Sequence, residues 1–365
     1  MGYQATLRAA AAAERRQQRD AKKRQRELER QAKEKAKLSA FEQARLEVDT
    51  FENNLDVLLS VHKEQTEPVD WIGILSSLPP ILPRKQAHYE LKVRRRLAVS
   101  PGWHNASAAI EQAQQKDEQE YQAALQLHAL EQAEWEKMAS LARRVLAGER
   151  EAYVEAINDL SPFAELATIG SSLHFTVHSG RIMECTLDTN GRKAIPAEVK
   201  SLTASGKVTV KPMPKARFVE IYQDYICGCV LRVAREIFGL LPVDTLLISA
   251  TAESLDTSTG QTLNRPFLSV VLRRDVLEQL NFDKLDPSDS ILSLMHRGDL
   301  KASRKTGDFE AITPLTVADL PSDCQERTDF SAFLATAQRL RSELAARAAA
   351  LNPQTDNTTT SNGDT

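Results

Sequence analysis

The sequence is poor in cysteine and has no long apolar run. Four cysteines in 365 residues (Cys185, Cys227, Cys229 and Cys324) are too few to hold a chain of this length together by disulfides. No 18 consecutive residues are both apolar and uncharged, which argues against a transmembrane helix. The sequence also lacks a charged start followed by an apolar segment, so secretion is not expected. We therefore expect a cytoplasmic protein with no membrane partner, in which the cysteines are small buried side chains.

Recognisable catalytic motifs are also lacking. The sequence contains no phosphate-binding G-x-x-x-x-G-K loop, no G-x-G-x-x-G, no G-x-S-x-G and no H-E-x-x-H. His174 and His178 share one face of a predicted strand, but a rise of about 3.3 Å per residue separates them by about 13 Å. A hairpin at Ser179-Gly180 places His174 across from Cys185, and two ligands without a third do not make a zinc site. We expect neither a metal nor a cofactor, apart from Mg²⁺ under the nuclease alternative given below.

The first 50 residues lack proline, and after Gly2 they lack glycine. Residues 5–50 consist mostly of Ala, Arg, Lys, Gln and Glu, which favour a long helix. The first 37 residues contain only two large aliphatic side chains, Leu7 and Leu28, so a coiled-coil seam is missing. Residues 8–38 carry twelve Lys/Arg and five Asp/Glu, whereas the whole chain has a net charge of −3. The sequence thus predicts a basic helical arm on an acidic body.

Two interpretations of this arm remain open. It is either a solvated charged helix or a contact for nucleic acid or another acidic partner. No aromatic residue follows Tyr3 within the arm to stack on bases, and the interspersed acids weaken its field. The arm has no bulky apolar face for a membrane surface. The candidate phosphate contacts are Arg15, Arg16, Arg19, Lys22, Lys23, Arg24 and Arg26.

Composition and periodicity divide the chain into six predicted parts. These are a charged helical arm (1–65), a proline-containing connector with a short helix (66–103), a helical stalk (104–168), an α+β domain (169–320), a C-terminal helix (321–351) and a disordered tail (352–365). The stalk carries a broken apolar stripe, predicted to pack, that includes Leu127, Leu130, Trp135 and Met138, and Gly148 is expected to interrupt the stalk. We expect the stalk to pair with residues 38–62 or 84–99 as a helical hairpin.

The α+β domain is predicted as an antiparallel meander, a long buried helix and a further hairpin. A period of two begins at Ser172, and turns are expected at Ser179-Gly180, at Asn190-Gly191 and at Gly206-Lys207. Ala194–Leu202 is then a third antiparallel strand beside Arg181–Asp188. The helix Arg217–Leu241 should expose only one polar stripe, and Thr245–Ala250 should pair with Pro266–Leu272. The stripe comprises Arg217, Glu220, Asp224, Gly228, Arg232 and Arg235.

One short string resembles a catalytic motif. Glu198-Val199-Lys200, before a long helix and a buried strand, resembles the E-x-K half of a PD-(D/E)XK nuclease site, with Asp188 as the acidic partner. That resemblance implies that Asp188 and Glu198 hold Mg²⁺ and that Lys200 polarises water. A two-residue turn at Asn190-Gly191 argues against it, because Asp188 would then lie roughly 17 Å from the level of Glu198, on the opposite face. The rival interpretation is a solvated strand face.

A second resemblance covers residues 170–316. The strings YQDYICGCVLRVAREIFGLLPVDTLLISA, LDTSTGQT, LNFDKLDPSDSI and KTGDFEAITPL resemble an uncharacterised bacterial protein family. The resemblance implies a bacterial, cytoplasmic protein and carries no activity or site residues. The preferred hypothesis is a non-enzymatic interaction or scaffold protein with a protein partner. The alternatives are a Mg²⁺-dependent nuclease and a nucleic-acid-binding protein without catalysis.

Overall fold

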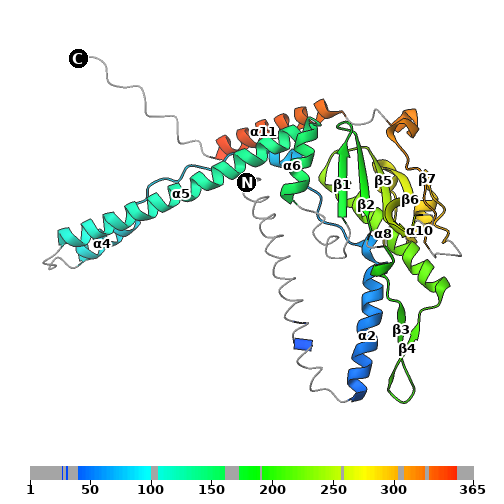
Figure 1. Ribbon diagram of the computed structural model, residues 1–365. Helices are drawn as coiled ribbons and strands as arrows, with labels where there is room; N and C mark the ends of the chain where they lie inside the picture. The colour runs from blue at the N-terminus through cyan, green and yellow to red at the C-terminus, as the bar shows by residue number, and fades with distance from the viewer. Residues whose placement is uncertain are drawn as a thin grey trace. The chain divides into compact units, whose positions relative to one another are not determined.

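The computed structural model describes residues 27, 30–31, 40–99, 106–160, 172–189, 191–255, 259–302, 308–324 and 329–351. The described part of the chain combines helices with two β-sheets, which confirms the predicted α+β class (Figure 1). It divides into two compact units. Among the described residues, unit 1 contains those from 71 to 143 and from 332 to 351, and unit 2 contains those from 27 to 70 and from 144 to 331. None of the described helices is both long enough and apolar enough to span a membrane.

Unit 2 is built on a five-stranded sheet in the order β1-β2-β5-β6-β7. Its strands are β1 (Ser172–Val177), β2 (Ile182–Asp188), β5 (Thr245–Leu255), β6 (Thr262–Arg273) and β7 (His296–Arg297). All neighbouring pairs are antiparallel except β2 and β5, which are parallel. The crossover between these two strands contains α8 (Lys215–Leu240), the long buried helix that the sequence predicts. The predicted hairpin of β5 with β6 is confirmed.

Apolar side chains fill both faces of the sheet. On the α8 side, alternate residues of the central strands, such as Met183, Cys185 and Ile248, have no exposed surface. On the other side, Ile182, Leu247 and Val271 form a cluster with the segment that carries Leu315, Leu320 and Cys324. This segment includes the short 3-10 helices η3 (Val317–Asp319) and η4 (Ser322–Cys324). Strand β2 is therefore an interior strand, covered on both faces.

The third antiparallel strand of the predicted meander is wrong. Strand β3 (Glu198–Leu202) does not pair with β2; it pairs with β4 (Val208–Pro212) in a separate two-stranded sheet. The free edge of β2 is occupied by β5, whose apolar side chains are fully buried there. Gly191–Ala194 is a 3-10 helix, η2, and Asn190 lies outside the described residues. The turn at Gly206 is confirmed, with a φ of +77° that favours glycine.

The register of the first hairpin also differs from the prediction. β1 and β2 are antiparallel as expected, but His174 faces Thr186 and Phe175 faces Cys185. His178 and Ser179 both donate their backbone N–H to the carbonyl of Ile182, so the loop is one residue longer than Ser179-Gly180 alone. A shift of one residue exchanges the faces, and Cys185 therefore points into the core, away from the side chain of His174.

The remaining helices of unit 2 are α2 (Ala40–Leu59), η1 (Val61–Lys63), α6 (Arg150–Leu160), α9 (Arg274–Leu277) and α10 (Pro287–Leu292). Of these, η1 and α10 contact α8, and α2 contacts the two-stranded sheet. Helix α2 lies along the β3–β4 hairpin (Figure 1). The prediction that Asp286 is the N-cap of a helix with Pro287 at its first position is confirmed, since the Asp286 side chain accepts the N–H of Asp289.

Unit 1 is helical. It contains α3 (Trp71–Ser76), α4 (His88–Val99), most of α5 (Ala106–Leu146) and, from Ala332, most of α11 (Phe330–Leu351). The buried Trp135 of α5 packs with Met138 and Ala139, and its indole N–H donates to the hydroxyl of Ser77 at 2.9 Å. The predicted interruption at Gly148 is confirmed: α5 ends at Leu146 and Gly148 has a φ of +76°.

Helices α4 and α5 form a hairpin, which confirms one of the two expected pairings of the stalk (Figure 1). The Asp117 side chain on α5 accepts the backbone N–H groups of Tyr89 and Glu90 at 2.8 and 2.9 Å. These amides belong to the first turn of α4, where N–H groups have no partner within the helix. Lys85 also pairs with Glu118 at 2.5 Å. Asp117 therefore fixes the level at which α4 lies on α5.

Candidate functional site

The three residues of the predicted nuclease site lie on two different sheets. Asp188 ends β2 of the five-stranded sheet, where its carboxylate lies 3.5 Å from the hydroxyl of Thr251. Glu198 and Lys200 lie on β3 of the two-stranded sheet, and Glu198 is exposed. Lys200 donates to the carboxylate of Glu47 on α2 at 2.7 Å. The Lys200 ammonium thus has an acidic partner that the sequence interpretation did not include.

The other candidate metal ligands of the sequence analysis are histidines and cysteines. Among the described residues, no group of three His, Cys, Asp or Glu side chains has the geometry to hold a metal ion. His178 pairs with Glu184 at 2.8 Å. All four cysteines are buried free thiols, and burial raises the pKa of Cys229 to about 12. Such thiols stay protonated at neutral pH and are poor nucleophiles and metal ligands. The seven basic candidates from Arg15 to Arg26 lie outside the described residues.

A small hollow in unit 2 is lined by charged and aromatic side chains. Arg192 pairs with Asp308 at 3.4 Å and lies over the ring of Phe218, while Tyr222 stacks on Phe309. Burial raises the pKa of Tyr222 to about 12, so its phenol remains a hydrogen-bond donor and not a base at neutral pH. The hollow has room for only a few water molecules. It is too small to hold an organic substrate.

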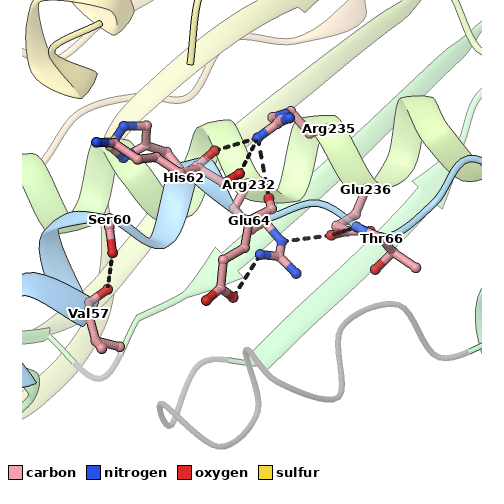
Figure 2. A network of polar contacts seen from close by, with 9 residues as sticks. Val57, Ser60, His62, Glu64, Thr66, Arg232, Arg235 and Glu236 are labelled. Atoms are coloured by element: carbon pink, nitrogen blue, oxygen red, sulfur yellow. Dashed lines mark hydrogen bonds and ion pairs between the residues drawn. The ribbon is translucent and has the colours of Figure 1, made fainter. Parts of the chain in front are cut away.

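The most extensive buried polar network among the described residues lies on α8, where the predicted exposed stripe is confirmed at Arg217 and Glu220 but wrong at Gly228 and Arg232. Arg232 and Glu236 are only 5 and 2% exposed. They form an i,i+4 ion pair, with Arg232 Nε 2.7 Å from Glu236 Oε1, and Arg232 also reaches Glu64 at 3.1 Å (Figure 2). Glu236 accepts the backbone N–H of Thr66 at 2.9 Å. Residues 61–66 therefore cover the part of α8 that the sequence analysis assigned to solvent.

Arg235 holds the same segment through its backbone. Its guanidinium donates to the carbonyl oxygen of His62 at 2.7 Å (Figure 2). It also donates to the carbonyl oxygen of Lys63 at 3.1 Å and to the side chain of Gln65 at 2.6 Å. It also lies 4.0 Å from the ring centre of Phe282. Carbonyl groups at the end of a short helix lack partners within it, and an arginine satisfies several of them at once. These contacts make the network a structural clamp between η1 and α8.

His62 is buried within this clamp, at 2% exposed, and neither ring nitrogen has a hydrogen-bond partner. Burial, followed by the neighbouring charges of Lys63 and Arg235, lowers the pKa of His62, although Asp286 acts in the opposite direction. The imidazole is therefore neutral at pH 7. Gly228 lets η1 lie close to α8, because a Cβ at position 228 would meet the side chain of Val61 at 2.9 Å.

The lowered pKa predicts that the clamp weakens in acid. The unfolded chain binds a proton at His62 near the ordinary pKa of 6.5, whereas the folded chain does so only at lower pH. The stabilisation is fully present above that value and is lost as the pH falls below it, by at most about 1.4 kcal/mol per pH unit. Urea unfolding between pH 7.5 and 5 measures this loss, and His62→Phe should flatten the profile. An equally steep profile in His62→Phe would contradict the assignment to His62.

The α4–α5 hairpin of unit 1 presents a surface that the sequence analysis missed. None of the residues of α4 is buried. Leu91 on α4 is 51% exposed, and Leu127 and Leu130 on α5 are 58 and 66% exposed. The apolar stripe predicted for the stalk had assigned both Leu127 and Leu130 to packed positions. We define the hairpin surface as Ala123, Leu127, Leu130 and Glu134, which share one face of α5.

Comparison with known proteins adds no relative. No family model, no curated protein and no solved structure matches the chain significantly. The class of protein is therefore argued from the geometry described above.

Proposed function

We propose that the chain is a non-enzymatic interaction protein of the cytosol that binds a protein partner through the α4–α5 hairpin. The observation that carries this proposal is the hairpin surface, because Leu127 and Leu130 lie on one face of α5 and are each more than half exposed. Apolar side chains gathered on one surface are typical of protein interaction sites. The buried free thiols support a reducing compartment. The chemistry described so far supports no catalytic set, since the polar clusters are ion pairs with a structural role.

A photo-crosslinking amino acid at position 130 tests the proposal in growing cells. We expect a covalent adduct of defined mass from Leu130, because its side chain is exposed on the hairpin surface. The matched control places the same amino acid at Ser205, an exposed residue in the turn between β3 and β4, and should give no adduct. Equal labelling at both positions, or none at Leu130, would remove the support for an interaction role of the hairpin.

Substitution of Lys200 distinguishes the proposed function from the nuclease alternative. We expect Lys200→Ala to lower the free energy of unfolding by less than about 1 kcal/mol, because it removes one partly exposed ion pair. We expect no Mg²⁺-dependent cleavage of DNA or RNA by either protein. Glu47→Gln is the matched control, since it removes the same ion pair and keeps the lysine. Cleavage that survives Glu47→Gln and disappears in Lys200→Ala would establish the nuclease instead.

A further inference from the structure

The two-stranded sheet of unit 2, residues 198–212, lies in a part of the chain that is rich in basic residues; we call it the β3–β4 ribbon. Residues 199–217 contain five Lys or Arg and neither Asp nor Glu, although the whole chain has 50 acidic and 47 basic residues. Four of the five cations are exposed and form no ion pair with the described part of the chain. They are Lys207, Lys211, Lys215 and Arg217. The ribbon therefore carries uncompensated positive charge in an acidic chain.

The pairing of the strands gives the ribbon two faces. Lys200 donates to Glu47 of α2 at 2.7 Å, so the face that carries Lys200 lies toward α2 (Figure 1). Side chains alternate between the faces along each strand, and directly paired residues share a face. Because Val199 is paired with Lys211, both lie on the opposite face. We define the outward face by this alternation as Val199, Ser201, Thr203, Lys207, Thr209 and Lys211.

The outward face presents ammonium and hydroxyl groups and no carboxylate. Lys207 and Lys211 are both exposed, and four residues of strand separate them by about 14 Å. Four nucleotides of a DNA strand rise by about the same 14 Å along the duplex axis. Ser201 and Thr209, a directly paired couple, place two hydroxyls between the lysines. Lysine, serine and threonine are among the side chains that contact phosphate oxygens, so the outward face suits a row of phosphates.

Two further cations lie where the ribbon joins α8. Lys215 and Arg217 occupy the first turn of α8, which has no acidic residue. The helix dipole favours acidic side chains in a first turn and disfavours basic ones, so helix stability does not explain these two residues. They extend the positive charge of the ribbon to its base.

We propose that the outward face of the ribbon binds the sugar-phosphate backbone of duplex DNA without sequence preference. The major groove of B-form DNA admits a two-stranded β-ribbon, whereas the major groove of double-stranded RNA is too deep and narrow to admit side chains. Residues 198–212 contain no aromatic side chain to stack on the bases of a single strand. They also contain no Arg, Asn or Gln for paired hydrogen bonds to base edges, so the contact is with the backbone.

A membrane surface suits the outward face less well than DNA does. Val199 is the one aliphatic side chain on the face, and it is half-buried, so no apolar group is available to insert between lipids. The site lies on unit 2 and does not depend on the proposed function, which concerns α5 of unit 1.

Neutralising the lysines tests the contact in the full-length protein. Each of Lys207→Gln and Lys211→Gln should reduce the slope of log K against log salt concentration by about 0.9, and the double variant by about 1.8. At about 0.1 M salt the double variant should bind a duplex roughly 60-fold more weakly. The matched control is Lys200→Gln, which removes one charge from the face toward α2 and should leave the slope unchanged. Fluorescence anisotropy of a labelled duplex of mixed sequence measures the slope.

Charge-preserving variants separate an electrostatic contact from a structural effect. Lys207→Arg/Lys211→Arg keeps both charges and should keep the slope. An unchanged slope in the double Gln variant would overturn the proposal even if DNA still bound, because the contact would then lie elsewhere, such as on the basic arm. A wild-type protein that binds no duplex at low salt would overturn it too. The same holds if a single strand binds more tightly, or if polyglutamate competes as well as unlabelled duplex, which would indicate an acidic protein partner.

Photo-crosslinking tests which face of the ribbon makes the contact. A photo-crosslinking amino acid at Ser201, which is exposed on the outward face, should form an adduct with duplex DNA. The matched control is the same amino acid at Val210, which is 46% exposed and shares the face of Lys200. Equal yields at both positions would overturn the assignment to the outward face. Nuclease treatment removes a DNA adduct but not the protein adduct expected at Leu130, so the two proposals succeed or fail separately.

Discussion

Replacing Glu236 with leucine is expected to destabilise unit 2 by about 3–5 kcal/mol. Glu236 is 2% exposed, and it is the buried partner of Arg232, which is itself 5% exposed. Without the carboxylate, the guanidinium loses its buried counter-charge, the side chain of its other acidic partner Glu64 is 59% exposed, and the N–H of Thr66 loses its acceptor. A buried charge without a close counter-charge is among the few single changes that cost this much. Hydrogen exchange of the α8 amides measures the effect within unit 2 alone.

Two further variants isolate the cause. Glu236→Gln keeps an acceptor for the Thr66 N–H and removes the charge, so the difference between the two single variants reports the hydrogen bond. The double variant Arg232→Met/Glu236→Leu removes both charges and should recover most of the stability lost in Glu236→Leu. The sum of the losses in the single variants Arg232→Met and Glu236→Leu is the reference. If the double variant lost as much stability as that sum, the unpaired charge would not be the cause.

The sequence predicts individual helices and strands of unit 2 better than their partners. The alternation that begins at Ser172, the Pro-bounded helix before Pro242 and the Asp286 N-cap all depend on residues close in the chain. The pairing of β2 with β5 depends on the match of two apolar faces about 60 residues apart. The Asn190-Gly191 signal favoured the nearer strand. Because β5 occupies that edge, Glu198 and Lys200 belong to a different sheet from Asp188.

Exposure was harder to predict than periodicity on both long helices. On α8 the polar side chains do share one stripe, but residues 61–66 cover its C-terminal part, and no pattern within α8 indicates that cover. The signal that was available is the i,i+4 spacing of Arg232 and Glu236, which permits a buried pair. On α5 the error is reversed. Leu127 and Leu130 continue the stripe of Trp135 in sequence, but they lie outside the cluster formed by Trp135, Met138 and Ala139.

Gly298→Ala is expected to have a comparably large effect, about 3–5 kcal/mol, through the backbone. Gly298 follows β7 with a φ of +100°, and a Cβ there would overlap the carbonyl oxygen of Phe267 on β6. Strand β7 lies on β6 through only two residue pairs, and Arg297 holds the segment near Asp319 at 2.7 Å. The added methyl group cannot move away without separating these strands, because its neighbour is backbone.

Gly260→Ala is the matched control for this substitution. Gly260 has a similar positive φ of +71°, but none of the described residues beyond its chain neighbours has an atom within 4 Å of the position its Cβ would take. Gly260→Ala should therefore lower the free energy of unfolding only by the cost of placing an L-residue in the left-handed region, about 1–2 kcal/mol. Hydrogen exchange of the β6 amides in the two variants separates strain from overlap. Equal losses would show that β7 shifts freely on β6, and a larger loss in Gly298→Ala would show that this close backbone contact holds the edge of the sheet.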